Sequence, residues 1–294
     1  LLWEGYSNMK IDQNPFSLYD FLGYLVPGLL FFTGINLIIM INKAQPKCLN
    51  INALKIEEFL FVIFGCYFIG HILSYISSIT IENYSRWTIG YPSRYLLKHE
   101  RNKFWIRRDA GAFQYINVLN FLKILISLFL FPITVFDLFI RQILKLENYL
   151  KKPLDNLLVE LIKKSVLQYV LSNYDLSKVP TKKTNEERDF FRIIYHYTLE
   201  NAPNHRSKMQ NYVALYGFTR TMSLSIVLLF WVELFFLIKL GFSFRNSVLF
   251  GSSFMLSYVL YLDFNKFYRK YTLESLMAML IQYKYQLVKK SNDA

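Results

Sequence analysis

Apolar residues gather in four runs that are long enough, or nearly so, to cross a membrane as helices. The runs cover residues 21–41, 59–79, 222–238 and 248–262. A helix needs about 20 mostly apolar residues to cross the hydrocarbon core of a bilayer. No run alternates apolar and polar positions as barrel strands do, and backbone groups in lipid must be hydrogen-bonded internally. The pattern therefore predicts an all-α, polytopic helical membrane protein with four transmembrane helices.

A fifth apolar run, ILISLFLFPITVF at residues 124–136, is too short for an ordinary crossing and too apolar to face water. Runs of about 10 to 14 residues are more often re-entrant or interfacial. Pro132 lies near its middle and marks a turning point. We therefore predict a re-entrant or interfacial helical segment over residues 124–140, with a full crossing as the alternative.

The distribution of basic residues favours the re-entrant arrangement, because loops rich in Lys and Arg tend to stay in the cytoplasm. If the fifth run does not cross, all but five of the 34 Lys and Arg residues share one side; a crossing would divide them far less unevenly. The five are Lys43, Lys47, Lys55, Lys239 and Arg245. We expect a multi-pass protein of the cell (inner) membrane with both termini in the cytoplasm.

The spans and loops predict four parts of the chain. Residues 1–81 and 221–263 form an N-terminal and a C-terminal transmembrane hairpin, and residues 82–220 form a basic cytoplasmic or interfacial helical region. Leucines and a methionine recur at helical spacing after the last span, so residues 264–294 are expected to form a final amphipathic helix. Residues 207–240 contain no proline, which predicts one long helix joining the cytoplasmic region to the third span.

Composition supports the membrane assignment and adds a charge signal. With 53% hydrophobic and 18% aromatic side chains, the chain is too apolar for an ordinary soluble domain. Its net charge of +13 would attract anionic lipid headgroups, whereas direct contact with nucleic acid is not expected for a membrane-anchored chain. The residues expected to contact anionic lipid or a cytoplasmic protein partner are Arg86, Arg94, Lys98, Arg101, Lys103, Arg107 and Arg108.

Small residues recur every fourth position in the second apolar run. They are Cys66, Gly70, Ser74 and Ser78. This spacing places them along one side of a helix and lets a second helix backbone approach closely. The stripe predicts a packing seam against the first span or against a second copy in a homo-oligomer. In the first span, Pro27 is expected to kink the helix.

Three polar residues lie within the apolar runs and are the candidates for a functional midplane. Glu233 lies deep in the third span, His71 is in the second span, and Asn36 is in the first. Ionisable side chains are costly in lipid and mark functional positions when they face the bundle interior. A contact between His71 and Glu233 is one hypothesis, with a structural pair, an ion path and a proton relay as competing interpretations.

Sequence motifs for catalysis or metal binding are lacking. His196 and Glu200 are four residues apart on a predicted helix, but two ligands do not make a metal site. Cys48 and Cys66 offer no disulfide framework or metal set. We expect no catalytic residues, no metal, no cofactor and no enzymatic activity. A lipid-acting enzyme would need a convergent polar cluster, such as His196 and Glu200 with His205 beside Arg206.

Three stretches resemble uncharacterised small bacterial multi-pass membrane proteins of a kind sometimes found beside antiviral defence genes. They are FSLYDFLGYLVPG at residues 16–28, HYTLENAPNH at residues 196–205 and QNYVALYGFTRTMSL at residues 210–224. The resemblance implies a membrane-disrupting effector and carries no catalytic residues with it.

Two functional hypotheses follow. The first is a non-enzymatic, channel-like or membrane-perturbing effector, controlled by a cytoplasmic partner and acting in prokaryotic antiviral defence. The second is a transporter or membrane scaffold subunit that binds an ion or small solute at the midplane. An effector pore needs a wet path lined by several copies, whereas a transporter can close its path within one chain.

Overall fold

The computed structural model describes most of the chain, and the described part is almost entirely helical with no strand. The described residues are 20–42, 55–99, 113–144, 151–173 and 190–292. Within them, four helices are long and apolar enough to cross a membrane, and a bent helix pair could supply a fifth crossing. The all-α class and the four predicted spans are thereby confirmed.

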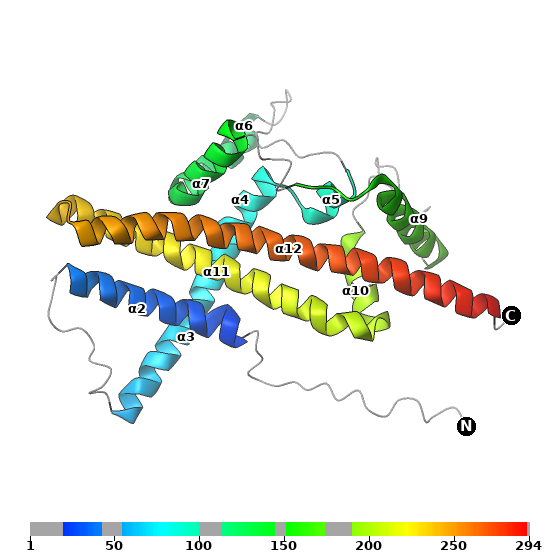
Figure 1. Cartoon of the computed structure of the whole chain (residues 1–294), viewed down its shortest axis with the longest axis horizontal. Helices are drawn as coiled ribbons and strands as arrows, with labels where there is room; N and C mark the ends of the chain where they lie inside the picture. Colours follow the sequence, from blue (N-terminus) through cyan, green and yellow to red (C-terminus); the bar gives the residue numbers. More distant parts are fainter. Residues whose placement is uncertain (1–19, 43–54, 100–112, 145–150, 174–189, 293–294) are drawn as a thin grey trace.

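A hairpin of two very long helices forms the axis of the molecule (Figure 1). Helix α11 runs from Pro203 to Leu240 and helix α12 from Phe244 to Asn292. At 1.5 Å per residue these helices are about 57 and 74 Å long, roughly twice the hydrocarbon thickness of a bilayer. Gly241 takes a positive φ of 85° directly after α11, as expected of a helix-ending glycine. The two helices therefore reach well beyond any membrane that they cross.

Helix α12 differs from the sequence prediction of a separate amphipathic helix over residues 264–294. It continues from the last span to Asn292 without a break. No proline or glycine follows Gly251, so nothing in the backbone interrupts the helix. The change from an apolar to an amphipathic pattern alters what the helix contacts but does not end it.

The first span lies alongside α11 and begins with a π-helical turn. This turn, η1 (Phe21–Leu25), leads directly into α2 (Val26–Ile41). Pro27 is the second residue of α2, and the π-helical turn directly before it lies where the hydrogen bond that Pro27 cannot donate would fall. The far end of α2 is tied to the start of α12, because Asn246 donates a hydrogen bond from Nδ2 to Oδ1 of Asn42 at 2.7 Å.

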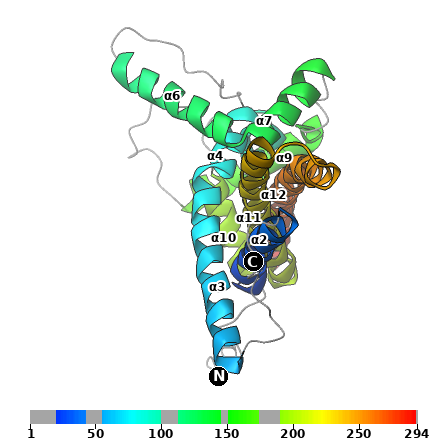
Figure 2. The same cartoon turned by 90° about the vertical axis from the view of Figure 1, so that its left-hand side faces the viewer.

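The second span, α3 (Ile56–Ile79), crosses the other spans obliquely and continues into α4 (Ile81–Thr88). Figure 2 shows α3 standing beside the hairpin, which is seen nearly end-on. Its outer side is strongly apolar: Phe61, Phe64 and Phe68 are 79%, 66% and 66% exposed. Exposed aromatic side chains in such number suit contact with lipid rather than water.

The fifth apolar run forms two helices that meet at a sharp bend. Helix α6 (Phe113–Phe129) and α7 (Phe131–Leu138) form the arms of a V in Figure 2, and η3 (Phe139–Ile143) prolongs the second arm. The two arms are bent by 97° at Leu130. The sequence placed the turning point at Pro132, two residues later. Pro132 is instead the second residue of α7, in the first turn, where a proline is tolerated.

Three short helices pack around the part of the hairpin farthest from its tip. They are α5 (Pro92–Leu96), α9 (Asn156–Asn173) and α10 (Phe191–Asn201). We call them, with the helix ends that they cover, the peripheral layer. It has its own apolar core, separate from the one between the spans. Burial and the nearby phenols of Tyr169 and Tyr283 raise the pKa of Tyr197 in this core to about 12, so its hydroxyl stays neutral.

Candidate functional site

A buried carboxylate joins the bent helix pair to the end of the second span. Asp137 on α7 is fully buried, and its Oδ2 accepts a hydrogen bond from the hydroxyl of Tyr84 on α4 at 2.8 Å. Arg141, one turn later, forms an ion pair with the same oxygen. The carboxylate is therefore held from two sides, and its charge is balanced within the protein.

The carbonyl oxygen of Thr88, the last residue of α4, accepts hydrogen bonds from two cationic side chains. Lys151 donates to this oxygen at 2.8 Å and Arg141 at 3.4 Å. The last carbonyl groups of a helix lack helical donors and carry partial negative charge, so cations stabilise them. The hydroxyl of Thr88 also lies 3.4 Å from that of Tyr261 on α12. The polar network formed by Tyr84, Thr88, Asp137, Arg141 and Lys151 thus links three helical elements.

Some polar atoms in and beside this network are buried without a hydrogen-bond partner among the described residues. They include Oδ1 of Asp137, Nε of Arg141 and the hydroxyl of Tyr258. Tyr258 lies close to the bent pair, since its ring stacks with that of Phe136 at 5.3 Å. Buried polar atoms without partners are costly. This cost marks the region as a candidate site for a small polar ligand or an ion.

A second buried ion pair joins three helices near the boundary of the spans. Arg220 on α11 pairs with Glu82 on α4 and donates from Nε to the hydroxyl of Ser77 on α3 at 3.2 Å. Its guanidinium also lies over the ring of Tyr216, 5.5 Å from the centroid. This contact ties the second span to the long helix α11.

Glu233 is an ionisable side chain buried within the third span. It is 2% exposed, and its Oε2 is buried without a hydrogen-bond partner in the described part of the chain. It follows Leu229 by one helical turn, and Leu229 faces the first span, where a Cβ on Gly34 would lie 2.5 Å from it. Because residues four apart share one helical side, Glu233 lies on the side of α11 that meets α2.

The structure does not form the predicted contact between His71 and Glu233. His71 is exposed on α3 and stacks on Tyr24, with ring centroids 3.8 Å apart, while Tyr67 meets it edge-on at 4.6 Å. Its ring is held beside the start of the first span. Asn36 donates from Nδ2 to the carbonyl of Phe32 at 2.8 Å, within its own helix.

Two members of the small-residue stripe lie where the first and second spans cross. A Cβ added to Gly70 would stand 1.9 Å from the carbonyl oxygen of Tyr24, and one on Gly28 would stand 1.8 Å from that of Cys66. The helix backbones are thus in direct contact at this point. The seam faces the first span of the same chain here. Ser74 and Ser78 are less buried than Cys66.

The basic residues predicted to contact lipid or a partner divide into two groups. Arg101, Lys103, Arg107 and Arg108 lie outside the described residues. Arg86 and Arg94 gather around Tyr91, with their guanidinium carbons 5.6 and 5.8 Å from its ring centroid. Lys98 donates to Asn156 at the start of α9. The described basic residues are therefore engaged within the peripheral layer.

Two members of the cluster considered for a lipid-acting enzyme, His205 and Arg206, have partners outside it. His205 binds Glu274 on α12 through Nδ1 at 2.8 Å, and Lys208 binds the other carboxylate oxygen at 2.8 Å. Arg206 donates to the carbonyl of Leu199. In the described ranges, no group of three His, Cys, Asp or Glu residues is arranged to hold a metal ion.

The sequence prediction missed the network around Asp137. One local signal was available, because Asp137 and Arg141 are one helical turn apart at the polar end of the fifth apolar run. Tyr84, Thr88 and Lys151 carry no such signal. They come from separate segments, and only the fold brings them to the carboxylate.

Four apolar helices, a buried ion pair between two of them and a bent apolar helix pair define a helical integral membrane protein. No protein-family model, curated protein or solved structure matches the chain. The assignment to this class therefore comes from the composition and the fold.

Proposed function

We propose that the protein is a non-enzymatic, channel-like membrane protein that lets ions cross or perturbs the bilayer. The observation that carries the proposal is Glu233, an ionisable side chain buried in an apolar span with one carboxylate oxygen lacking a partner. Burial of an unpaired charge in a span is costly. A residue held there at such cost is suited to binding a cation or proton in transit.

The long helix α11 supplies a route for control. It contains Glu233 near one end and reaches the peripheral layer at the other, where His205 and Lys208 bind Glu274 on α12. A cytoplasmic partner that shifts this end of α11 would move Glu233 with it, because no proline interrupts the helix. This arrangement requires the peripheral layer and both termini to be cytoplasmic, as the distribution of basic residues predicts.

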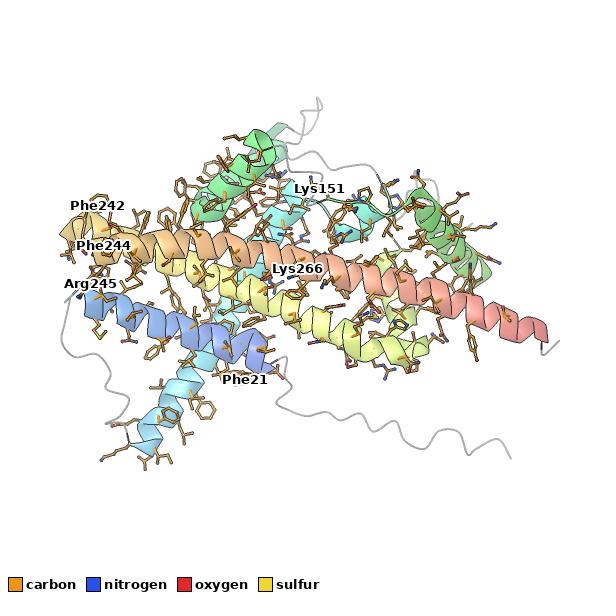
Figure 3. All side chains as sticks on the ribbon, viewed as in Figure 1. Phe21, Lys151, Phe242, Phe244, Arg245 and Lys266 are labelled. Atoms are coloured by element: carbon orange, nitrogen blue, oxygen red, sulfur yellow. The ribbon has the colours of Figure 1, made fainter. Side chains whose placement is uncertain are left out.

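Assembly and lipid contact complete the proposal. Phe242 and Phe244, at the tip of the hairpin beside Arg245, are 85% and 86% exposed (Figure 3). A channel lined by several copies would cover part of such apolar surface, and anionic headgroups would neutralise basic residues of the peripheral layer. An effector role in prokaryotic antiviral defence is consistent with this activity and rests on the sequence resemblance alone.

A transporter or scaffold subunit is the second candidate. It is favoured by the position of Glu233 on the side of α11 that meets α2, the helix that also contains Asn36. Such a protein would close its binding site within one chain. It would then show saturable solute uptake as a monomer, whereas a pore would pass current only as an oligomer.

Membrane potential in expressing cells, together with ion flux from proteoliposomes, tests the proposal. Wild type should dissipate the potential, and Glu233→Gln should reduce the leak because it removes the charge while preserving the shape. Glu200→Gln, at an exposed position on α10, is the matched control and should behave like wild type. Folded wild-type protein that leaves the potential and the liposome gradient intact would refute the channel proposal.

A further inference from the structure

A cavity of about 520 Å³ lies in the peripheral layer, between α4, α5, α10, α11 and α12. Three arginines from three different helices line it, namely Arg86, Arg94 and Arg192. Among the described lining residues, the one carboxylate belongs to Glu82, which is already paired with Arg220. In this described lining, three guanidinium groups therefore outnumber the carboxylate.

The arginines differ in how firmly they are held. Arg86 donates to the hydroxyl of Tyr91 at 2.9 Å and also to Asn83, but its Nε is buried without a partner in the described chain. Arg94 lies over the same Tyr91 ring. Arg192 is exposed on the first turn of α10 and makes no ion pair with the described residues. One arginine is thus preset by its neighbours while another is available to a ligand.

Stacked phenol rings form another part of the cavity wall. Tyr216 and Tyr268 have ring centroids 5.4 Å apart with an interplanar angle of 23°, and Tyr271 is nearly parallel to Tyr216 at 6.4 Å. All three line the cavity. Such a stack is rigid and adds apolar faces and hydroxyl groups to the charged side. The wall suits a ligand that is not purely ionic.

We propose that this cavity binds a phosphate-bearing anion. Guanidinium groups donate paired hydrogen bonds to phosphate oxygens, which makes arginine clusters the usual protein partners of phosphate esters. The volume lies within the range of roughly 300 to 1,000 Å³ typical of small-molecule sites. The ligand would bridge α5 and α10 to the long hairpin. Binding does not depend on whether the protein conducts ions.

A phosphate ester can reach this site from two sources, namely an anionic lipid headgroup or a soluble nucleotide. Calorimetric titration of the full chain in neutral detergent separates them. The probes are inorganic phosphate, adenosine monophosphate and short-chain phosphatidylglycerol, with short-chain phosphatidylcholine as the zwitterionic reference. Saturable binding of phosphatidylglycerol alone supports a lipid site, and binding of the nucleotide supports a soluble ligand.

The decisive variant is the double substitution Arg94→Gln with Arg192→Gln. It should weaken binding by about tenfold or more, because hydrogen bonds to charged groups are lost. Its matched control, Lys164→Gln with Lys284→Gln, removes the same charge at exposed positions outside the cavity and should bind like wild type. Arg192→Gln alone, at an exposed site, should show a smaller loss and guards against misfolding of the double variant.

Two outcomes would overturn the proposal. Equal weakening by both double variants would mean that the probes respond only to the overall charge of the protein. The absence of saturable binding of all three anionic probes to wild-type protein would mean that the arginine cavity is not a phosphate site.

Discussion

The hydroxyl of Tyr84 donates a hydrogen bond to Oδ2 of Asp137 across 2.8 Å, although 53 residues separate them in the sequence. Both side chains are buried at 1% and 0% exposure. The contact fixes the bent helix pair against the end of the second span, inside the apolar core that also contains Leu130 and Tyr261. A polar contact inside an apolar core therefore holds the bent pair in position.

Asp137→Asn should destabilise the protein strongly. It would leave Arg141 buried beside a neutral amide, and breaking a buried ion pair by removing one partner costs about 3 to 5 kcal/mol. The control is Asp263→Asn, which breaks the exposed pair between Asp263 and Lys266 and should cost less than about 1 kcal/mol. Thermal unfolding in detergent measures both. Similar midpoints for the two variants would contradict the role given to the buried network.

Gly70→Ala should separate the first and second spans. Its Cβ would lie 1.9 Å from the carbonyl oxygen of Tyr24, a backbone atom that cannot move aside without shifting the helix. Gly65→Ala on the same helix meets nothing within 4 Å, so it should be neutral or stabilise by up to about 1 kcal/mol through helix propensity. A yield and melting temperature for Gly70→Ala equal to those of Gly65→Ala would show that the helices do not cross here.

Trp231→Phe should loosen the bend between α6 and α7. The indole N–H of Trp231 donates to the carbonyl of Phe129 at 2.8 Å, directly before the bend at Leu130. Loss of this bond should cost about 1 kcal/mol and speed hydrogen exchange in α6. Trp87→Phe is the control, since it keeps an aromatic face for Lys123, whose Nζ lies 5.5 Å from the ring. Unchanged exchange in Trp231→Phe would argue against the bond.

Cysteine labelling tests the orientation of the chain. In a background with Cys48→Ser and Cys66→Ser, a cysteine at Lys164 should be protected from an impermeant reagent in intact cells, because α9 is expected to be cytoplasmic. A cysteine at Lys55, at the exposed start of α3, should react. The reverse pattern, or labelling of both positions, would overturn the proposed topology. It would also overturn the proposed control by a cytoplasmic partner.

The sequence by itself determined the class of this protein, the place of its four apolar spans and the continuity of α11, whereas it did not predict that α12 continues unbroken to Asn292. A long apolar run indicates a helix that lies in lipid, because a helix in lipid must be apolar over most of its length. The unbroken helix α11 followed from the lack of proline after Pro203. These are local properties, because each depends only on residues that are neighbours in the sequence.

The turns were predicted less well because proline has two uses. Pro132 was predicted as the turning point, yet it lies in the first turn of α7. Pro27 lies directly after a π-helical turn of the same continuous helix, so it does accompany an irregularity. The departures from α-helix come earlier, in the π-helical turn over Phe21–Leu25 and at the bend at Leu130. A proline marks such an irregularity but does not say on which residue it falls.

Only the tertiary structure decided which polar groups meet. It placed His71 beside Tyr24 and left Glu233 apart from it. It also brought Tyr84 to Asp137 and three arginines to one cavity. The partner of a buried charge depends on which helices pack together, and that packing depends on contacts between segments distant in the sequence. The spacing of residues along the chain does not show these contacts.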